Sequence, residues 1–528
     1  MINLQNATYI HPNKQVLFED LNFTVNKQEK IALIGNNGIG KSTLLKIIAG
    51  QLSLSSGQLS YASSPYYIPQ ILDSYNGLSI SQALGVSQKL TAFQQILAGE
   101  LTEENMEMLN DDWTIEDRIH AALGDVGLSD MDLTKKIGQL SGGQKTKVFL
   151  AGIFIQDPEI VLLDEPSNHL DTKGRALLYD FVERTNKTLV IVSHDRQLLK
   201  QLSTTVEFTK KGLTRYGGNY DFYQQQKSMA QQALDQELNH QQKELNKAKN
   251  IQREAIQRQA KLNARGKRKQ EQAGVPKIMI NVLKNKAEGS SSKLKSVHQD
   301  KIANIKTHLT TLREDLAELD QIKFNFEQSN LHQGKILFDA LDINYEINAT
   351  PLWNKPLNFQ IKHGDRLAIA GQNGAGKTTL LNLLLGKIKP SQGKILSCQI
   401  NSLYVDQEYS LLQTNLTVYE MAQSYNDTGL LEHEIKIRLD RFLFKEDRWD
   451  DPCSFLSGGE RMRLLICILT ILNKAPDLII LDEPTNNIDL QNISILTHAI
   501  NNYHGTLIIV SHDQQFLHDL QIEQKIDL

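Results

Sequence analysis

Four short motifs occur twice in the chain, in the same order, and this internal repeat constrains the fold more than any other feature. GNNGIGKST at residues 35–43 returns as GQNGAGKTT at 371–379, and LSGGQ at 140–144 returns as LSGGE at 456–460. IVLLDEP at 160–166 returns as LIILDEP at 478–484, and VIVSHD at 190–195 returns as IIVSHD at 508–513. The sequence therefore predicts two copies of one α/β domain within its 528 residues.

The two copies differ in length between a glutamine that follows the first motif and the LSGG motif. The offset between copies is 337 at Gln70 and Gln407, but 316 at Ser141 and Ser457. The first copy thus has an excess in this stretch, which carries helix-type sequence. We interpret it as a longer helical subdomain, with a small arm that touches a partner as the alternative.

Each copy begins with an apolar run, a glycine-rich loop and a helix, which is the context that a phosphate-binding loop requires. Backbone N–H groups of such a loop surround phosphates, a lysine reaches the β- and γ-phosphates, and a hydroxyl holds Mg²⁺. The predicted nucleotide-binding residues of the first loop are Gly35, Asn36, Asn37, Gly38, Ile39, Gly40, Lys41, Ser42 and Thr43. Those of the second are Gly371, Gln372, Asn373, Gly374, Ala375, Gly376, Lys377, Thr378 and Thr379.

Acidic residues end a second apolar strand in each copy. The carboxylates there can meet a metal through water, and the glutamates that follow can polarise the attacking water. A histidine ends the next strand and can contact the γ-phosphate, and a glutamine after a further strand can sense the metal. The predicted metal-site residues are Ser42, Thr378, Gln70, Gln407, Asp164 and Asp482, and the predicted catalytic residues are Glu165, Glu483, His194 and His512.

The LSGG segments open helices and present hydroxyl and N–H groups at a helix N-terminus, which favours an anion. The anion cannot be the nucleotide of the same copy if that site already holds its own lysine and metal. We therefore expect the copies to face head to tail, so that each segment covers the nucleotide of the other. The residues concerned are Ser141, Gly142, Gly143, Ser457, Gly458 and Gly459.

A basic segment separates the two copies. From Lys243 to Lys306 there are seventeen Lys and Arg against five Asp and Glu, whereas the whole chain has a formal net charge of −4. Residues 221–262 and 281–325 have helix-type sequence around a break at 263–279, which predicts an antiparallel hairpin about 60 Å long at about 1.5 Å per residue. Such charge indicates a polyanionic partner, or else only a solvated face.

We favour RNA, because apolar residues flank the basic break and can pack against exposed bases or sugars. The predicted RNA contacts are Arg265, Lys267, Arg268, Lys269 and Lys277.

Membrane and secretory features are not expected. No apolar run approaches the roughly 18–20 residues that cross a bilayer, and the N-terminus lacks the pattern of a signal peptide. The three cysteines, Cys398, Cys453 and Cys467, form no CxxC pair, which argues against a zinc site or a disulfide framework. We therefore expect a cytoplasmic protein.

Together, the phosphate loop, glutamine, LSGGQ, Asp–Glu and histidine motifs resemble those of the ATP-binding cassette ATPases. DEPSNHLD at 164–171 and the GGNYDFYQQQK entry to the insert at 217–227 narrow the resemblance to the F subfamily. It implies two ABC-type ATPase domains, 1–220 and 331–528, joined by a helical hairpin linker, 221–330. It also implies ATP and Mg²⁺ as ligands, and a monomer whose cassettes pair within the chain.

The resemblance further implies that the linker enters the tRNA exit site of the ribosome and approaches the peptidyl-tRNA. The protein would bind in its ATP-closed state and leave after hydrolysis, either as a translation factor or as a factor that protects ribosomes from antibiotics. TNNID at 485–489 and LSGGE depart from the first copy, so the two sites are expected to turn over unequally. Tyr9, His11 and Tyr345 are all candidates for stacking on adenine.

Three other functions fit part of the sequence. A fused nucleotide-binding pair of a membrane importer would have a short linker, which the basic insert contradicts. A DNA-repair or chromosome-structuring ATPase would carry a longer coiled coil or cysteine pairs in its insert. A non-hydrolysing scaffold is disfavoured by Glu165 and Glu483.

Overall fold

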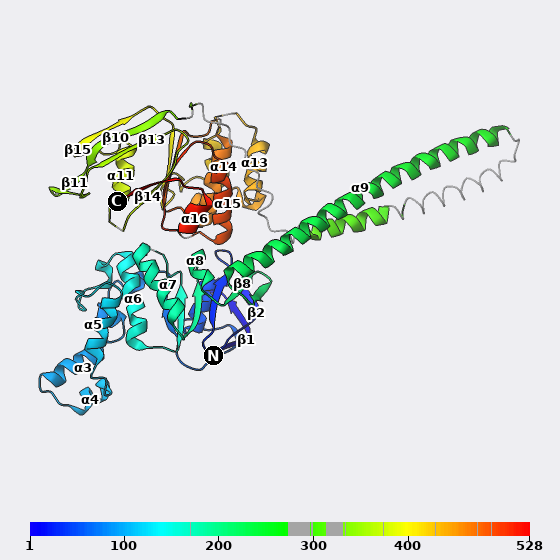
Figure 1. Cartoon of the computed structure of the whole chain (residues 1–528). Helices are drawn as coiled ribbons and strands as arrows, with labels where there is room; N and C mark the ends of the chain where they lie inside the picture. The colour runs from blue at the N-terminus through cyan, green and yellow to red at the C-terminus, as the bar shows by residue number, and fades with distance from the viewer. Residues whose placement is uncertain are drawn as a thin grey trace. The chain divides into compact units, whose positions relative to one another are not determined.

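The structure is a computed structural model of the chain (Figure 1). It describes residues 1–168, 170–272, 296, 299–312, 331–332, 334–372, 374–427, 429–472, 474–486 and 488–528. The chain divides into two compact units, one formed by Met1–Tyr223 with Gln321–Leu528 and the other by Gln224–Asp320. No helix among the described residues is both long and apolar enough to span a membrane.

The first copy of the repeat is built on two sheets. A parallel sheet has the order β5-β6-β7-β3-β8, and β9 adds to it antiparallel. A smaller antiparallel sheet has the order β2-β1-β4. The strands are β1 (Ile2–Ile10), β2 (Val16–Val25), β3 (Lys30–Ile34), β4 (Ser56–Tyr61), β5 (Tyr66–Ile68), β6 (Ile160–Asp164), β7 (Thr188–Val192), β8 (Thr204–Thr209) and β9 (Gly212–Tyr216).

Helices cover both faces of the larger sheet, so its central strands are apolar throughout, as is usual for parallel strands. All five residues of β6 and of β7 are buried. Residues of β3 alternate between two cores: Ile31 and Leu33 belong to one, and Ala32 and Ile34 to the other. The helices are α1 (Lys41–Ile48), α2 (Ile80–Ala83), α3 (Ser87–Leu97), α4 (Glu103–Leu109), α5 (Ile115–Asp125), α6 (Gly142–Gln156), α7 (Thr172–Arg184) and α8 (Arg196–Lys200).

The second copy repeats this plan. Its parallel sheet has the order β16-β17-β18-β14-β19, and its small sheet the order β13-β10-β15. The strands are β10 (Ile336–Asn344), β11 (Glu346–Ile347), β12 (Thr350–Pro351), β13 (Leu357–Lys362), β14 (Arg366–Ala370), β15 (Gln392–Ser397), β16 (Ser402–Val405), β17 (Leu478–Asp482), β18 (Thr506–Val510) and β19 (Gln524–Asp527). The helices are α11 (Lys377–Leu384), α12 (Val418–Ser424), α13 (Glu432–Arg441), α14 (Gly458–Ile471), α15 (Leu490–Asn501) and α16 (Gln514–Asp519).

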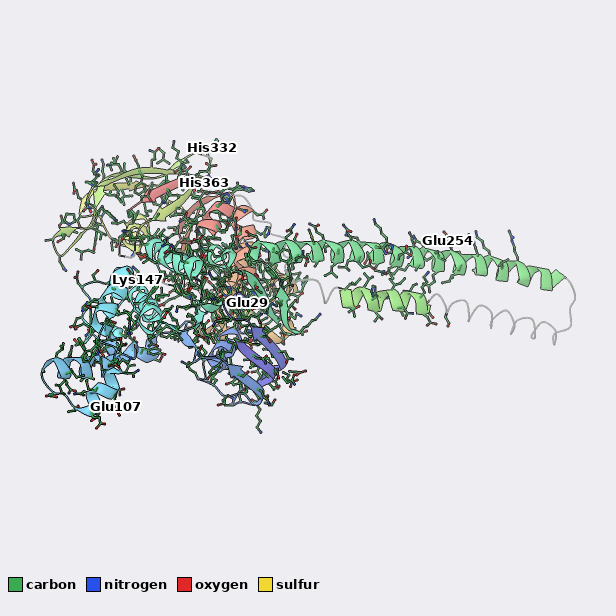
Figure 2. All side chains as sticks on the ribbon, turned by 60° about the horizontal axis from the view of Figure 1, so that its bottom comes forward. Glu29, Glu107, Lys147, Glu254, His332 and His363 are labelled. Atoms are coloured by element: carbon green, nitrogen blue, oxygen red, sulfur yellow. The ribbon has the colours of Figure 1, made fainter. Side chains whose placement is uncertain are left out.

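The prediction of two α/β domains in tandem is therefore confirmed. The extra residues of the first copy are helical as expected, since α3, α4 and α5 lie there. Glu107 lies on α4 and Lys147 on α6 (Figure 2).

The insert between the copies is helical, but the predicted break is wrong in part. Helix α9 runs for 53 residues, Tyr220–Gln272, through the first half of the stretch predicted to be a loop. Gly266 lies inside it, because one glycine costs a helix only about 1 kcal/mol and its Ala, Lys, Arg, Gln and Glu neighbours favour helix. Pro276, which would end a helix, comes later and lies outside the described residues.

A second helical stretch, residues 299–312, runs alongside α9 within the same unit, and Glu254 marks α9 in Figure 2. Leu245 and Ala248 of α9 and Leu309 of this stretch are buried. The pKa of Glu244 is lowered chiefly by its hydrogen bond from Lys247, with a smaller effect from Lys301. The helical linker is thus observed, while the remaining residues of 281–325 lie outside the described part of the chain.

Candidate nucleotide-binding site

The glycine-rich loops lie at the carboxyl ends of the central strands β3 and β14, where ligands bind in sheets of this type. Each loop ends in a left-handed glycine that caps the next helix: Gly40 has a φ of 112° and Gly376 a φ of 90°. The φ of Gly376 strains any residue with a side chain, and a Cβ atom there would also lie 2.5 Å from Leu352, so this position favours glycine. The first backbone N–H groups of α1 and α11 have no partner within their own helix, so they can face an anion.

The loop lysines fold back over their own loops. Lys41 Nζ donates to the carbonyl oxygens of Gly35 at 2.5 Å and Asn36 at 3.1 Å. Lys377 Nζ lies 3.0 Å from the Gly371 oxygen and 2.8 Å from His512 Nε2. Burial lowers the pKa of both lysines, and nearby carboxylates oppose this effect.

The acidic strand ends stand beside the loops because β6 pairs in register with β7, and β7 with β3. Asp164 Oδ1 accepts a hydrogen bond from Ser42 Oγ at 3.1 Å, and its Oδ2 accepts one from Tyr67 at 3.2 Å. In the second copy, Tyr404 donates to Asp482 Oδ2 at 3.2 Å. Burial raises the pKa of both aspartates.

Sequence reasoning missed the two tyrosines. Tyr67 and Tyr404 recur with the same offset of 337 as Gln70 and Gln407, which is the signal that could have found them. The two glutamines follow β5 and β16 at the same edge, but both are exposed.

Glu165 and Glu483 have an unusual backbone. Both have a φ of 50°, in the left-handed region that non-glycine residues rarely adopt, and both precede a proline, which restricts them further. Their N–H groups donate to the carbonyls of Val192 and Val510, each at 2.8 Å, which holds the strained turn against the next strand. Each carboxylate is thereby directed into a buried position between the acidic strand end and the histidine.

Burial makes it unfavourable for these two glutamates to carry a charge. It raises the pKa of Glu165 to about 8, with help from the charge of Asp164, and the pKa of Glu483 to about 7. Glu165 Oε1 and both carboxylate oxygens of Glu483 are buried without a hydrogen-bond partner. Such unsatisfied acceptors are costly unless a ligand or solvent reaches them.

The histidines lie against these glutamates. His194 Nε2 is 3.3 Å from Glu165 Oε1 and 3.2 Å from Asn37 Oδ1, and His512 Nε2 is 3.5 Å from Glu483 Oε1. Burial lowers the pKa of His194 well below its ordinary value, and that of His512 to about 4, with the lysine charge adding to the effect in each case. Both imidazoles are therefore neutral at pH 7.

We call these two clusters the Lys41 site and the Lys377 site. The first comprises Lys41, Ser42, Asp164, Glu165 and His194, and the second comprises Lys377, Thr378, Asp482, Glu483 and His512. Among the described residues no group of three or more His, Cys, Asp or Glu side chains forms a cation site. A hydroxyl 3.1 Å from a carboxylate beside a phosphate loop nevertheless suits Mg²⁺, which takes few protein ligands and is completed by phosphates and water.

The LSGG segments open helices as predicted. Ser141 and Ser457 cap α6 and α14, and each forms a capping box with the residue three positions later. The two boxes differ, because Ser457 Oγ also donates to Glu460 Oε2 at 2.8 Å. Arg448 lies 3.1 Å from the other oxygen of Glu460 and helps keep its pKa low, despite the opposing effect of burial.

Contacts between the two copies occur near both sites. The N–H group of Asn37 donates to Asp489 Oδ2 at 3.1 Å, which brings the first phosphate loop against the second copy. Asp171, the equivalent of Asp489, lies close enough to Lys377 to oppose the lowering of its pKa. Direct contact of the LSGG segments with the opposite loops remains a prediction.

The other predicted residues are placed as follows. Arg265 is exposed on α9, and Lys267, Arg268 and Lys269 follow it on the same helix. Lys277 and Asn373 lie outside the described residues. Of the adenine candidates, Tyr9 and His11 contact each other edge to face with ring centroids 5.4 Å apart, and Tyr345 is half-buried.

Comparison with known proteins agrees with this geometry. The ABC transporter family model matches residues 18–168 and 354–486. The ATP-binding protein Uup of Haemophilus influenzae is 30% identical, with 99% of this chain and 78% of Uup covered. The ABC transporter F family member 2 of Arabidopsis thaliana is 29% identical, with 98% and 75% covered. The chain belongs to the F subfamily of the ATP-binding cassette (ABC) family.

As an ABC-F protein the chain is an ATPase, and its two copies are ATP-binding cassettes. A solved structure of the archaeal ribosome recycling factor aABCE1 in complex with a ribosomal stalk protein shares the fold. Its TM-score is 0.58 at 18% identity, with 98% of this chain and 86% of that chain covered. The cassette architecture is thus common to both.

Proposed function

We propose that the chain binds two ATP molecules with Mg²⁺ at composite sites between its cassettes, within domains 1–220 and 331–528. The Lys41 site would be completed by Ser457, Gly458 and Gly459, and the Lys377 site by Ser141, Gly142 and Gly143. The hydrogen bond between Asn37 and Asp489 supports this pairing, because it joins a phosphate loop to the other cassette at a residue that follows the catalytic glutamate.

Within each site the residues have distinct roles. Ser42 with Asp164, and Thr378 with Asp482, would hold Mg²⁺, and Gln70 and Gln407 would reach it once the site is filled. The ion would neutralise charge on the β- and γ-phosphates during transfer to water. Glu165 and Glu483 would orient the attacking water, while His194 and His512 would contact the γ-phosphate through their neutral imidazoles.

We further propose a cytoplasmic protein that binds the ribosome in the ATP-closed state. The observation that carries this proposal is the insert, in which a 53-residue helix carries much of a strongly basic segment between the two cassettes. Arg265, Lys267, Arg268, Lys269 and Lys277 would neutralise phosphates of ribosomal or transfer RNA. Similar solved structures include ribosome-bound archaeal ABCE1, and the linker would occupy residues 221–330.

The cycle follows from two states of the cassettes. ATP bound across the interface would stabilise a closed form that presents the linker near the exit site and the peptidyl-tRNA. Hydrolysis would remove the γ-phosphate contacts and release the protein. The outcome for the ribosome would be either regulation of translation or protection from antibiotics.

The test is co-sedimentation of the full chain with purified ribosomes. Glu165→Gln combined with Glu483→Gln should bind ATP without hydrolysing it, so the variant should pellet with ribosomes only when ATP is present. Reversing the charges of Arg265, Lys267, Arg268 and Lys269 in the same background should weaken pelleting but leave ATP binding unchanged. ATP binding without pelleting would refute the ribosome proposal, and recovery in membranes instead would favour an importer ATPase pair.

A further inference from the structure

One ion pair joins the cassettes away from the phosphate loops. Arg196 is the first residue of α8 in the first cassette, and Asp519 is the last residue of α16 in the second. Arg196 Nη1 lies 2.6 Å from Asp519 Oδ2, and their side chains are 12% and 27% exposed. The pair is therefore short, charge-assisted and largely shielded from solvent.

The internal repeat shows that this pair has no ionic counterpart. His194 aligns with His512 at an offset of 318, and the same offset places Gln514 opposite Arg196 and Gln201 opposite Asp519. The repeat thus carries an arginine and an aspartate on one side and two glutamines on the other. We call Arg196 and Asp519 the one-sided junction.

In the first cassette, hydrogen bonds of the neighbouring Asp195 fix the start of α8, where Arg196 lies. Asp195 Oδ1 caps α8 by accepting from the N–H groups of Gln197 at 3.0 Å and Leu198 at 3.2 Å. The other oxygen of Asp195 accepts from Tyr179 at 2.6 Å and from Arg175 at 3.4 Å.

This bracing is also confined to the first cassette. The residues equivalent to Tyr179 and Arg175 are Thr497 and Ile493, which cannot make the same contacts. The start of α8, and Arg196 with it, is consequently fixed by bonds that α16 lacks.

Asp519 needs a cation where it stands. A carboxylate at the C-terminus of a helix faces the negative end of the helix dipole, which is unfavourable. Gln515 Nε2 donates to Asp519 Oδ1 at 2.8 Å, and Arg196 supplies the compensating charge at the other oxygen. Separating the cassettes here would leave a partly buried aspartate without Arg196, with only the exposed His518 Nδ1 at 3.8 Å from its Oδ1.

We propose that the one-sided junction ties the two cassettes together at one point whether or not a nucleotide bridges them. Closure on ATP then begins from cassettes already in contact at one point, which lowers the ATP concentration that closure requires. Arg196 and Asp519 would act by positioning the cassettes and not by touching the reacting atoms. The inference rests on the proposed function in assuming that ATP closes the cassettes.

The experiment places one spin label on each cassette of the full chain and measures their distance with and without ATP, in the Glu165→Gln, Glu483→Gln background. Arg196→Gln and Asp519→Gln install the residues of the opposite side. Each substitution should broaden the distribution of label-to-label distances measured without ATP. Each should also raise the ATP concentration at which half of the molecules are closed by about fivefold, the lower end of typical coupling between sites. High salt screens the ion pair, so it should broaden the distances and raise the required ATP concentration in the protein with Arg196 and Asp519 intact, but not in Arg196→Gln.

Two further variants control for unfolding and for loss of charge alone. Exchanging the charges, Arg196→Asp with Asp519→Arg, should restore the narrow distribution of label-to-label distances. Arg184→Gln should have no effect, because Arg184 pairs with Asp180 of its own helix at 79% and 49% exposure.

The outcomes separate the two proposals. Unchanged nucleotide-free distances in Arg196→Gln and Asp519→Gln would overturn the junction. If ATP moved the labels in no variant, closure itself would fail as a proposal, while the nucleotide-free comparison would still decide the junction.

Discussion

The Lys41 site and the Lys377 site contain the same chemical groups, but their lysines make different contacts. In both, a tyrosine bonds the strand-end aspartate and a glutamate with left-handed φ follows it. In the Lys41 site the lysine bonds only loop carbonyls among the described residues, whereas Lys377 also contacts His512. The difference teaches that identical motifs can stand in different surroundings, because the residues around them set the contacts of each lysine.

The proposed signature contacts differ as well. Ser457, which would face the Lys41 site, donates its hydroxyl hydrogen bond to the charged Glu460. The residue equivalent to Glu460 in the first cassette is the neutral Gln144, whose side chain accepts from the N–H group of Ser141. The Lys41 site would therefore meet an extra negative charge near its γ-phosphate. Each of the following predictions uses one cassette as the control for the other.

The largest effect should come from the glutamates. Glu165→Gln and Glu483→Gln should each reduce hydrolysis at their own site by about a hundredfold, because a general base typically contributes that much or more. The residual rate of each single variant then reports the opposite site. Steady-state ATPase assays should give unequal residual rates and almost none for the double variant, with exposed Glu159→Gln as the neutral control. Equal residual rates would mean that the sites are equivalent.

Exchanging the signature residues should have a smaller effect. Glu460→Gln should free the Ser457 hydroxyl and remove a charge, and so lower the KM for ATP at the Lys41 site by about fivefold, roughly one hydrogen bond in free energy. The measurement uses the Glu483→Gln background, in which turnover comes from the Lys41 site. Gln144→Glu in the Glu165→Gln background should have the opposite effect at the Lys377 site. A change at neither site would show that the signatures do not face these nucleotides.

The smallest effect should be on the stability of the nucleotide-free protein. The pKa of Glu165 is about 8 and that of Glu483 about 7 in the folded state, against 4.5 when unperturbed. Between these values the folded state binds more protons than the unfolded state, so native stability falls as the pH rises.

Replacement by neutral glutamine removes this loss. Glu165→Gln should therefore raise Tm by roughly 2 °C or more at pH 8 relative to its effect at pH 5. For Glu483→Gln the gain should level off at a lower pH, near 7. Thermal melts across this pH range check both, and pH-independent shifts in Tm would contradict the raised pKa values.

Sequence reasoning predicted the features that the repeated motifs carry. The phosphate loops, Asp164 and Asp482, and the capping serines are local patterns whose structure depends on a few neighbouring residues. It failed where a single glycine was given more weight than its helix-forming neighbours, and where tertiary packing decides a contact. The helix runs through Gly266 because strong helix formers surround it, and Arg196 finds Asp519 through the packing of two cassettes that differ at these positions.

The left-handed backbone at Glu165 and Glu483 has a consequence for how the protein would change under selection. Glycine relieves such a conformation, and it would also remove a buried acid that is hard to ionise. A library of random variants selected for surviving heat alone should therefore gather glycine at both positions. Under the catalytic role proposed for the glutamates, selection for ATP turnover would keep them there, so heat tolerance and turnover would compete at these two positions.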